Sequence, residues 1–479
     1  MARPRVHFRS PMPTSSSTHV SAGASAASDS VVAELRAVFK SGATTELSWR
    51  LAQLDGIIAL LSEQEPAIAA ALATDLGRNA TEAWLGDIAA TKAEAIYARK
   101  HLRSWMRKRR TTLPLAQLPG RAWIQHDPLG VVLVIGPWNY PVYLTLGPLV
   151  AAVAAGNAVV LKPSEVVPAT AALLASLVPR YLDPRAVRVV EGDALVTQHL
   201  ISEGVNHIVF TGGTDIGRKI MAAAAPTLTP VLLELGGKSP VVVAADADLD
   251  VAARRIAWLK LVNSGQTCIA PDYVLVDASV ADVLVTKICA SVAEFRSKEA
   301  DSRLRIVNER QFDRLATLIA GTTGRVVSGG QFDRDALLIE PTVIADPGND
   351  DRVMAEEIFG PILPVVRYES IDAAVELINS KPKPLALYVF SASRAWACDV
   401  IDRVPSGGAV VNHLAMHCMV PQLPFGGVGA SGMGAYHGRW GFEALSHQRA
   451  VLVKSTWPDL RLVYPPYTDR ALAIMRRLF

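Results

Sequence analysis

Cysteine is scarce in this chain of 479 residues. There are four, at positions 268, 289, 398 and 418. Their spacing matches neither a disulfide framework nor a CxxC site, which argues against a small secreted scaffold. We therefore expect a reducing compartment, the cytoplasm, in which Cys268 of "NSGQTCIAPDYVL" is a free thiol.

An excess of charge of either sign is also lacking. Lys and Arg number 48 against 45 Asp and Glu, for a net charge of +3. No broad basic field is available to bind nucleic acid, so we expect no such partner. Half of the residues are hydrophobic. This length and composition suffice for two or three compact domains.

A long uninterrupted apolar helix is lacking as well. Residues 131–161 contain no charge, but Pro137, Pro148 and Asn157 interrupt them. The pattern predicts a buried strand, a helix ended by Gly156 and a second buried strand. This is a βαβ unit, and we expect no membrane span.

The first 28 residues contain arginines and many serines and no acidic residue before Asp29. They include no apolar segment of the kind found in secretory signals. A disordered extension, a start codon assigned upstream of a true start at Met12, and a transit-type peptide all remain open.

The rest of the chain predicts an α/β fold. A helical segment leads into alternating strands and helices typical of a doubly wound, Rossmann-like cofactor domain, and a second α/β segment follows. Two further segments resemble paired strands with apolar edges, which indicates self-association, most simply as a homodimer. The expected parts are an extension (1–28), a cofactor domain (29–111 and 128–235), a catalytic domain (236–432), oligomerisation strands (112–127 and 445–460) and a tail (461–479).

Glu234 closes the apolar strand of "LELGGKSP". A carboxylate at the carboxyl end of a buried parallel strand lies where α/β enzymes bind ligands, and burial would raise its pKa toward that of a useful base. A helix-capping or ion-paired glutamate fits the same pattern.

Two further strand ends have the character of a nucleotide site. In "FTGGTDIGRK", Gly212 and Gly217 follow a strand and open a helix, as in a phosphate-binding turn, although G-G-x-x-x-G is a weak signal. In "LKPSE", Lys162 and Glu165 could hold the hydroxyls of a ribose, or form an ordinary surface pair.

Asn139 of "PWNYP" could donate its amide to an oxyanion, or simply form a turn. His413 and His417 of "HLAMHC" are spaced i, i+4 beside Cys418, which resembles metal-ligand spacing. No acidic third ligand lies within the pair, so we expect no metal site and place this loop at the substrate entrance.

Together and in this order, seven segments resemble the signatures of the NAD(P)-dependent aldehyde dehydrogenase superfamily. They are "PWNYP", "LKPSE", "FTGGTDIG", "LELGGKSP", "GQTCIAPDY", "EEIFGPILPV" and "PFGGVGASGMGAYHG". The separation of 34 between Glu234 and Cys268 (268 − 234) suits the family. The likeness runs from about Val31 to the C-terminus, and "CIAPDY", "GMGAYHG" and "YPPYT" indicate the class 3-like branch, with its fatty, aromatic and coniferyl-type enzymes.

The resemblance implies a role for each matching residue. Cys268 would be the nucleophile and Glu234 the general base, while Asn139 and the Cys268 backbone N–H would form the oxyanion hole. Residues implied to bind the cofactor are Lys162 and Glu165 at the adenosine ribose, Gly212 and Gly217 at the pyrophosphate, Glu357 and Phe359 at the nicotinamide, and Trp138.

The implied reaction converts an aldehyde to a carboxylic acid. Thiolate attack gives a thiohemiacetal, whose oxyanion expels hydride to leave a thioester for hydrolysis. We expect NAD as cofactor, with NADP possible, because Glu165 would repel a 2′-phosphate. Other readings are a CoA-acylating enzyme, against which Glu234 argues, a reductase, and a non-catalytic protein on this fold. Ser264 stands where some relatives have a second cysteine.

Overall fold

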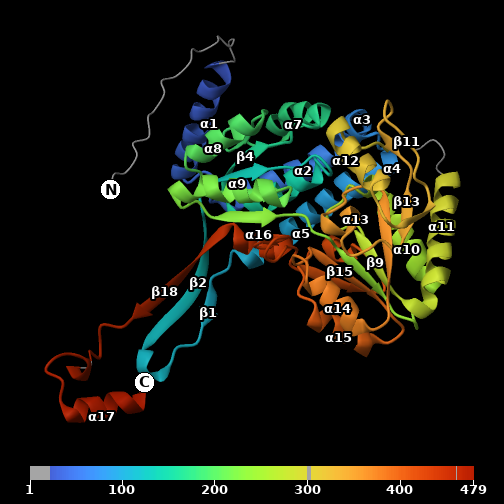
Figure 1. Cartoon of the computed structure of the whole chain (residues 1–479). Helices are drawn as coiled ribbons and strands as arrows, with labels where there is room; N and C mark the ends of the chain where they lie inside the picture. Colours follow the sequence, from blue (N-terminus) through green and yellow to red (C-terminus); the bar gives the residue numbers. More distant parts are fainter. Residues whose placement is uncertain (1–21, 299–303, 460, 479) are drawn as a thin grey trace, which may run out of the picture.

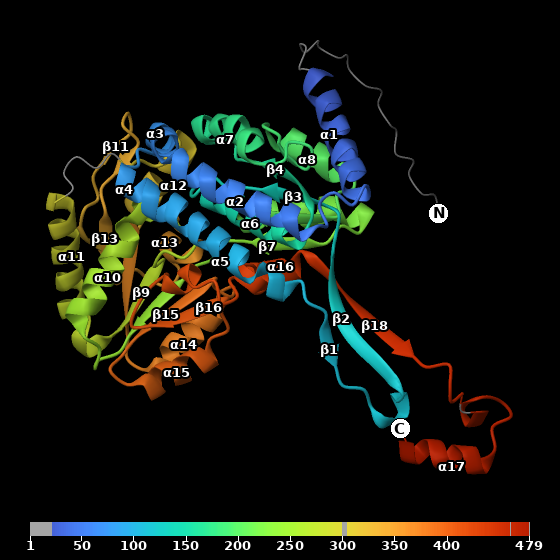
Figure 2. The same ribbon diagram turned by 180° about the vertical axis from the view of Figure 1, so that it is seen from behind.

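The structure is a computed structural model that describes residues 22–298, 304–459 and 461–478. Two α/β domains lie side by side, and a thin three-stranded arm projects away from them (Figure 1, and from behind in Figure 2). The extension expected over 1–28 lies outside the described residues as far as 21. Residues 22–28, however, are helical, in α1 (Ala22–Lys40).

The first domain is built on a six-stranded sheet of order β17-β7-β6-β3-β4-β5, in which only β17 is antiparallel. The strand order reverses at β3, with β4 on one side and β6 on the other, so the expected doubly wound topology is confirmed. Its strands are β3 (Val131–Ile135), β4 (Ala158–Lys162), β5 (Val187–Val189), β6 (His207–Thr211), β7 (Val231–Glu234) and β17 (Gly432–Met433).

Helices cover both faces of this sheet, which explains why most residues of its strands are apolar and buried. Val131 and Leu133 pack with α1, α8 and α9 on one face, whereas Val132 and Val134 pack with the helices of the other face. The helices are α2 (Leu47–Glu63), α3 (Glu65–Leu76), α5 (Ala90–Trp105), α6 (Tyr143–Ala155), α7 (Pro168–Tyr181), α8 (Ala194–Ser202) and α9 (Thr214–Ala224).

The uncharged stretch 131–161 is β3, α6 and β4, as predicted. Gly156 ends α6 in a left-handed conformation, with φ 90°. Within the described ranges, no single helix is long and apolar enough to cross a membrane; the α2–α3 pair, bent by 69°, reaches that length and composition only jointly.

The second domain contains a seven-stranded sheet of order β10-β13-β14-β9-β8-β15-β16. The chain enters it from β7 through residues 235–239. The strands are β8 (Pro240–Val243), β9 (Tyr273–Asp277), β10 (Arg325–Ser328), β13 (Thr342–Ala345), β14 (Ile362–Tyr368), β15 (Ala386–Phe390) and β16 (Gly408–Val411). The helices beside them are α10 (Leu249–Leu261), α11 (Ala281–Lys298), α12 (Glu309–Ala320), α14 (Ile371–Asn379) and α15 (Arg394–Arg403).

The arm consists of β1 (Arg109–Thr111), β2 (Gly120–Pro128) and β18 (Ser446–Lys454). β2 and β18 pair antiparallel over their full length, from Ser446 opposite Pro128 to Lys454 opposite Gly120, so the expected pairing of these segments is confirmed. The arm begins slightly earlier than predicted, at Arg109. Helix α17 (Asp469–Leu478) lies beyond the arm, away from both domains (Figure 1).

Before entering β18, the chain returns to the first domain. Gly432, where the sequence ended the catalytic segment, already pairs with Glu234 in the first sheet. Helix α16 (Gly438–Ala444) then packs on α5 and α6. The C-terminal segment therefore closes the edge of the sheet on which Glu234 lies.

Candidate active site

The site lies where the two sheets meet. Asn139, Lys162, Gly212 and Glu234 come from the carboxyl ends of β3, β4, β6 and β7, which are neighbours in the first sheet. Cys268 precedes β9 in the second domain. Because carboxyl ends of parallel strands share one edge, residues spread along the sequence converge there.

A cleft of ≈ 960 Å³ runs along this edge. Nine of the ten residues proposed from the sequence line it: Trp138, Asn139, Lys162, Glu165, Gly212, Glu234, Cys268, Glu357 and Phe359. The tenth, Gly217, is not part of its wall.

Glu234 is only 3% exposed. Neither of its carboxylate oxygens has a hydrogen-bond partner among the described residues. Burial raises the pKa of Glu234 well above its usual value, as expected. The capping and ion-paired interpretations are therefore wrong, and what is present is a buried, unpartnered carboxyl group facing the cleft.

Cys268 is half-buried at the wall of the cleft, and its loop is held in an unusual backbone conformation. Asn263 and Ser264 both have φ 52°, and Gly265 has φ 69°. Burial raises the pKa of the Cys268 thiol, and the charges of Glu357 and Glu234 raise it further. This environment therefore favours the protonated thiol over the thiolate.

Asn139 is 4% exposed and its side chain is fixed. Its Nδ2 donates to the backbone oxygen of Gln266, at 3.1 Å. An amide nitrogen has two hydrogens, so one remains for a ligand in the cleft. The bond joins the loop after β3 to the loop that carries Cys268.

The glycine turn requires small residues rather than unusual backbone angles. A Cβ on Gly212 would lie 2.5 Å from the Phe210 ring, and one on Gly217 would lie 2.6 Å from Leu235 Cδ2. Beside Gly213, which precedes α9, a Cβ would meet nothing within 4 Å. Gly217 thus serves the packing of α9 against the chain after β7, and Gly213 marks the open space at the start of the helix.

Lys162 is 3% exposed, which excludes an ordinary surface pair. Its Nζ donates to Glu165 Oε2 at 2.6 Å and to the oxygen of Gly192 at 2.9 Å. The Glu165 side chain is 49% exposed. A buried ammonium beside an accessible carboxylate is suited to bind neighbouring hydroxyl groups.

Glu357 and Phe359 face the cleft from the loop before β14. Burial is the main reason that the pKa of Glu357 rises to about 8. Glu357 Oε1 has no partner among the described residues, and a Cβ on Gly236 would lie 2.0 Å from Oε2. The Phe359 ring contacts Trp138 edge-on, with centroids 5.3 Å apart.

The His413–Cys418 segment does not form a metal centre. The described residues contain no cluster of three or more metal-ligating side chains. The backbone N–H of Leu414 donates to His413 Nδ1, and the two nitrogens are 2.8 Å apart. His417 packs against the rings of Tyr388 and Phe425, and burial lowers its pKa to about 4.

Sequence reasoning missed the side chains that hold the two loops. Asn263 and Gln266 are buried amides, and Gln266 Nε2 donates to the oxygens of Asn263 and Arg305. Lys238 and Asp272 form a buried ion pair, and Asp272 also accepts from the N–H of Ile358. Each of these polar residues lies beside a recognised motif, which was the only available signal. The sequence did not show which residue each of them contacts.

A doubly wound α/β fold whose cleft brings together a cysteine, a buried carboxyl group and an amide donor is typical of a dinucleotide-dependent oxidoreductase. Comparison with known proteins is more specific. A sequence model described as "Aldehyde dehydrogenase family" matches residues 2–451. The chain belongs to the aldehyde dehydrogenase family, and it is an NAD(P)-dependent enzyme of the class 3 branch.

Two curated relatives support this branch. Aldehyde dehydrogenase family 3 member H1 of Arabidopsis thaliana is 44% identical over 460 residues, which are 95% of each chain. The "Aldehyde dehydrogenase, dimeric NADP-preferring" of Rattus norvegicus is 46% identical over 440 residues, covering 91% of this chain and 97% of the relative.

Solved structures agree on the fold. The substrate-bound state of Staphylococcus aureus AldH has a TM-score of 0.91 at 38% identity, covering 94% of this chain and 99% of the other. A Mycobacterium tuberculosis aldehyde dehydrogenase complexed with NAD+ has a TM-score of 0.83 at 27% identity, covering 91% and 92%.

Proposed function

We propose that this enzyme oxidises medium- or long-chain aliphatic or aromatic aldehydes to carboxylic acids, through a covalent adduct on Cys268. The observation that carries the proposal is the meeting of Cys268, Asn139 and the unpartnered Glu234 in one cleft. Attack by the sulfur on the aldehyde carbon gives a thiohemiacetal oxyanion. The free amide hydrogen of Asn139 and the N–H of Cys268 stabilise that charge.

Glu234 has two tasks in this scheme. Because burial raises the pKa of the Cys268 thiol, the thiol must lose its proton as the sulfur attacks, and the Glu234 carboxylate is a suitable acceptor. Once the thioester has formed, Glu234 removes a proton from the attacking water. A buried carboxyl base is what a hydrolytic enzyme needs and a CoA-acylating enzyme does not.

The cleft fits a dinucleotide cofactor. The open space beside Gly213, the buried Lys162 and the free oxygen of Glu357 offer places for phosphate and hydroxyl groups. When bound, the cofactor accepts the hydride, and its positive ring favours the thiolate. We propose a preference for NAD+, because a 2′-phosphate would meet the carboxylate of Glu165.

Lys162→Ala should raise the KM for NAD+ by roughly 10- to 150-fold, the equivalent of ~1.5–3 kcal/mol for a charge-assisted hydrogen bond. The aldehyde KM should change little, because Lys162 lies at the adenosine end. Initial rates over a cofactor series measure both. Glu165→Gln is the matched variant: it should improve NADP+ relative to NAD+. Unchanged cofactor affinity in Lys162→Ala would refute the ribose role.

Product analysis tests the overall function. Aliphatic, benzaldehyde-type and cinnamaldehyde-type substrates are each incubated with NAD+ or NADP+, with and without CoA. We expect one carboxylic acid per NADH and no effect of CoA. Formation of an acyl-CoA, or no turnover of any aldehyde, would contradict the proposal.

We propose further that the protein is a homodimer that associates through its arm. The apolar side chains of Leu452 and Val453 on β18 are each 50% exposed, and so is Leu118 beyond β1. An unpaired strand edge with exposed apolar residues is suited to pair with a second copy. "Dimeric" in the name of the rat relative agrees.

Light scattering at micromolar concentration should give twice the chain mass of 51.2 kDa. Leu452→Arg should shift the equilibrium toward the monomer, because it places a charge on the arm. Leu195→Arg, at a position 69% exposed on α8, is the matched control and should remain a dimer. A monomeric parent protein would contradict the assignment.

We also propose that the enzyme works in a reducing compartment, the cytoplasm. All four cysteines are free. Subcellular fractionation of the native host tests this placement, with free thiols labelled during lysis. The protein should be found in the cytoplasmic fraction with its cysteines reduced.

A further inference from the structure

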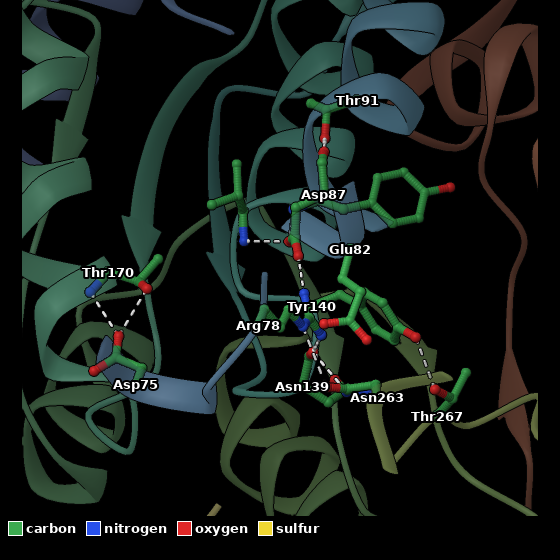
Figure 3. Close-up of polar contacts among 12 residues, drawn as sticks. Asp75, Arg78, Glu82, Asp87, Thr91, Asn139, Tyr140, Thr170, Asn263 and Thr267 are labelled. Carbon is green, nitrogen blue, oxygen red and sulfur yellow. Dashed lines mark hydrogen bonds and ion pairs between the residues drawn. The ribbon is translucent and has the colours of Figure 1, made fainter. Parts of the chain in front are cut away.

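Arg78 is a buried arginine that joins the two loops of the active site, although no sequence motif indicated it. It lies between α3 and α4 (Ala80–Ala83) and is 3% exposed. Figure 3 shows its guanidinium among Asn139, Tyr140, Asn263 and Asp87. A charge in this position is costly to bury, so its contacts need an explanation.

On one side, Arg78 holds the loop that carries Asn139. Nη2 donates to the backbone oxygen of Asn139, and the guanidinium stacks 4.4 Å above the Tyr140 ring. Nη1 pairs with Asp87, whose other oxygen accepts the N–H groups of Val142 and Tyr143, both at 2.9 Å. The Arg78–Asp87 ion pair therefore holds both the loop after β3 and the start of α6.

On the other side, Arg78 reaches the loop that carries Cys268. Nε donates to Asn263 Oδ1 at 3.2 Å. Asn263 Nδ2 donates to the oxygens of Asn139 and Gln266, both at 3.0 Å. The hydroxyls of Tyr140 and Thr267, the residue before Cys268, are 2.8 Å apart.

We propose that Arg78 is a positioning residue that sets the Asn139 amide relative to Cys268 for stabilisation of the oxyanion. This inference rests on the function proposed above. The guanidinium fork is rigid and donates in three directions, so it fixes both loops at once. It also holds Asn263 in its left-handed conformation, next to the left-handed Ser264.

Arg78→Lys keeps the positive charge but removes the planar guanidinium group with its several donors. Lysine can keep the pair with Asp87, but it cannot reach Asn139 and Asn263 together. We expect the pre-steady-state burst of NADH to slow by about 10- to 100-fold, the scale of a small misplacement of reacting groups. NAD+ affinity and the aldehyde KM should stay within about twofold, since Arg78 does not line the cleft.

A double-mutant cycle tests whether Arg78 acts through Asn139. Arg78→Lys should slow the burst in the parent enzyme but hardly at all in the Asn139→Ala background. Equal slowing in both backgrounds, or a parent-like burst in Arg78→Lys, would overturn the inference. If the Asn139→Ala variant alone has a normal burst, the proposed oxyanion role itself fails.

Arg50→Lys is the matched control. Arg50 is also 3% exposed, and it bonds the backbone oxygens of Thr45 and Ala154, away from the cleft. Its replacement should lower the Tm and leave the burst unchanged.

Should Arg78→Lys fail to fold, Asn263→Ala provides a second test, because it keeps the Arg78–Asp87 pair and removes the link to the loop that carries Cys268. It should slow the burst similarly, and a normal burst would count against Arg78.

Discussion

Cys268→Ala should abolish aldehyde oxidation and leave NAD+ binding intact. The loss should be on the order of 10⁶-fold, the scale seen when a covalent nucleophile is removed, because neither the thiohemiacetal nor the thioester can form. Cofactor binding should persist because Lys162 and Gly213 belong to the first domain, whereas Cys268 belongs to the second. Steady-state rates and cofactor titration of the same preparation measure both.

The other cysteines supply the controls. Cys418 is half-buried, but unlike Cys268 it does not line the cleft that holds Asn139 and Glu234. Cys398 is exposed on α15. Cys418→Ala and Cys398→Ala should both turn over at rates close to the parent. Substantial turnover by Cys268→Ala would sink the nucleophile assignment.

Glu234→Gln should separate the two halves of the reaction. Glutamine keeps the shape of the side chain and removes the base. If hydride transfer still proceeds, NADH appears as a burst of about one equivalent per site. The following steady rate should be lower by roughly 10²–10⁴-fold, the usual contribution of a general base. Mass spectrometry of quenched enzyme should find an acyl adduct on Cys268.

The rate of the burst shows whether Glu234 also acts before hydride transfer. A slow burst in Glu234→Gln would mean that Glu234 also takes the thiol proton, as the raised pKa of Cys268 suggests. Glu357→Gln is the matched control: this carboxyl group is also buried in the cleft, but it should affect cofactor affinity and accumulate no adduct. Parent-like turnover of Glu234→Gln with no adduct would place the base elsewhere.

The pH dependence follows from the same carboxyl group. Burial raises the pKa of Glu234, and only its deprotonated form is a base. The deacylation rate of the parent enzyme should therefore rise with pH toward a plateau as Glu234 ionises. Glu234→Gln should lack that titration.

Much of the fold could be read from the sequence because its signals are local. Apolar runs bounded by glycine and proline located β3, α6 and β4 within a residue or two. The active-site residues at strand ends followed, since carboxyl ends of parallel strands share an edge. Two features have no local signal in the sequence and are visible only in the structure: the start of α1 at Ala22 and the pairing of Gly432 with Glu234 in the first sheet.

The contacts of Arg78 could not be predicted from the sequence. Arg78 is 61 residues from Asn139 and 185 from Asn263 along the chain, and the surrounding sequence "LGRNATEAW" does not indicate a contact with either residue. Such a contact is decided by how α3, the loop after β3 and the loop before β9 pack together. Only a folded chain brings these three segments to one point.

By itself, the sequence determined the chemistry that is present: a cysteine, a carboxylate, an amide and a lysine, each at the end of a buried strand or in a polar loop. Tertiary structure alone decided the state of those groups. It left Glu234 without a partner, kept Lys162 buried and raised the pKa of Cys268. The reason is physical, because charge state depends on burial and on neighbours distant in the chain, which residue order does not specify.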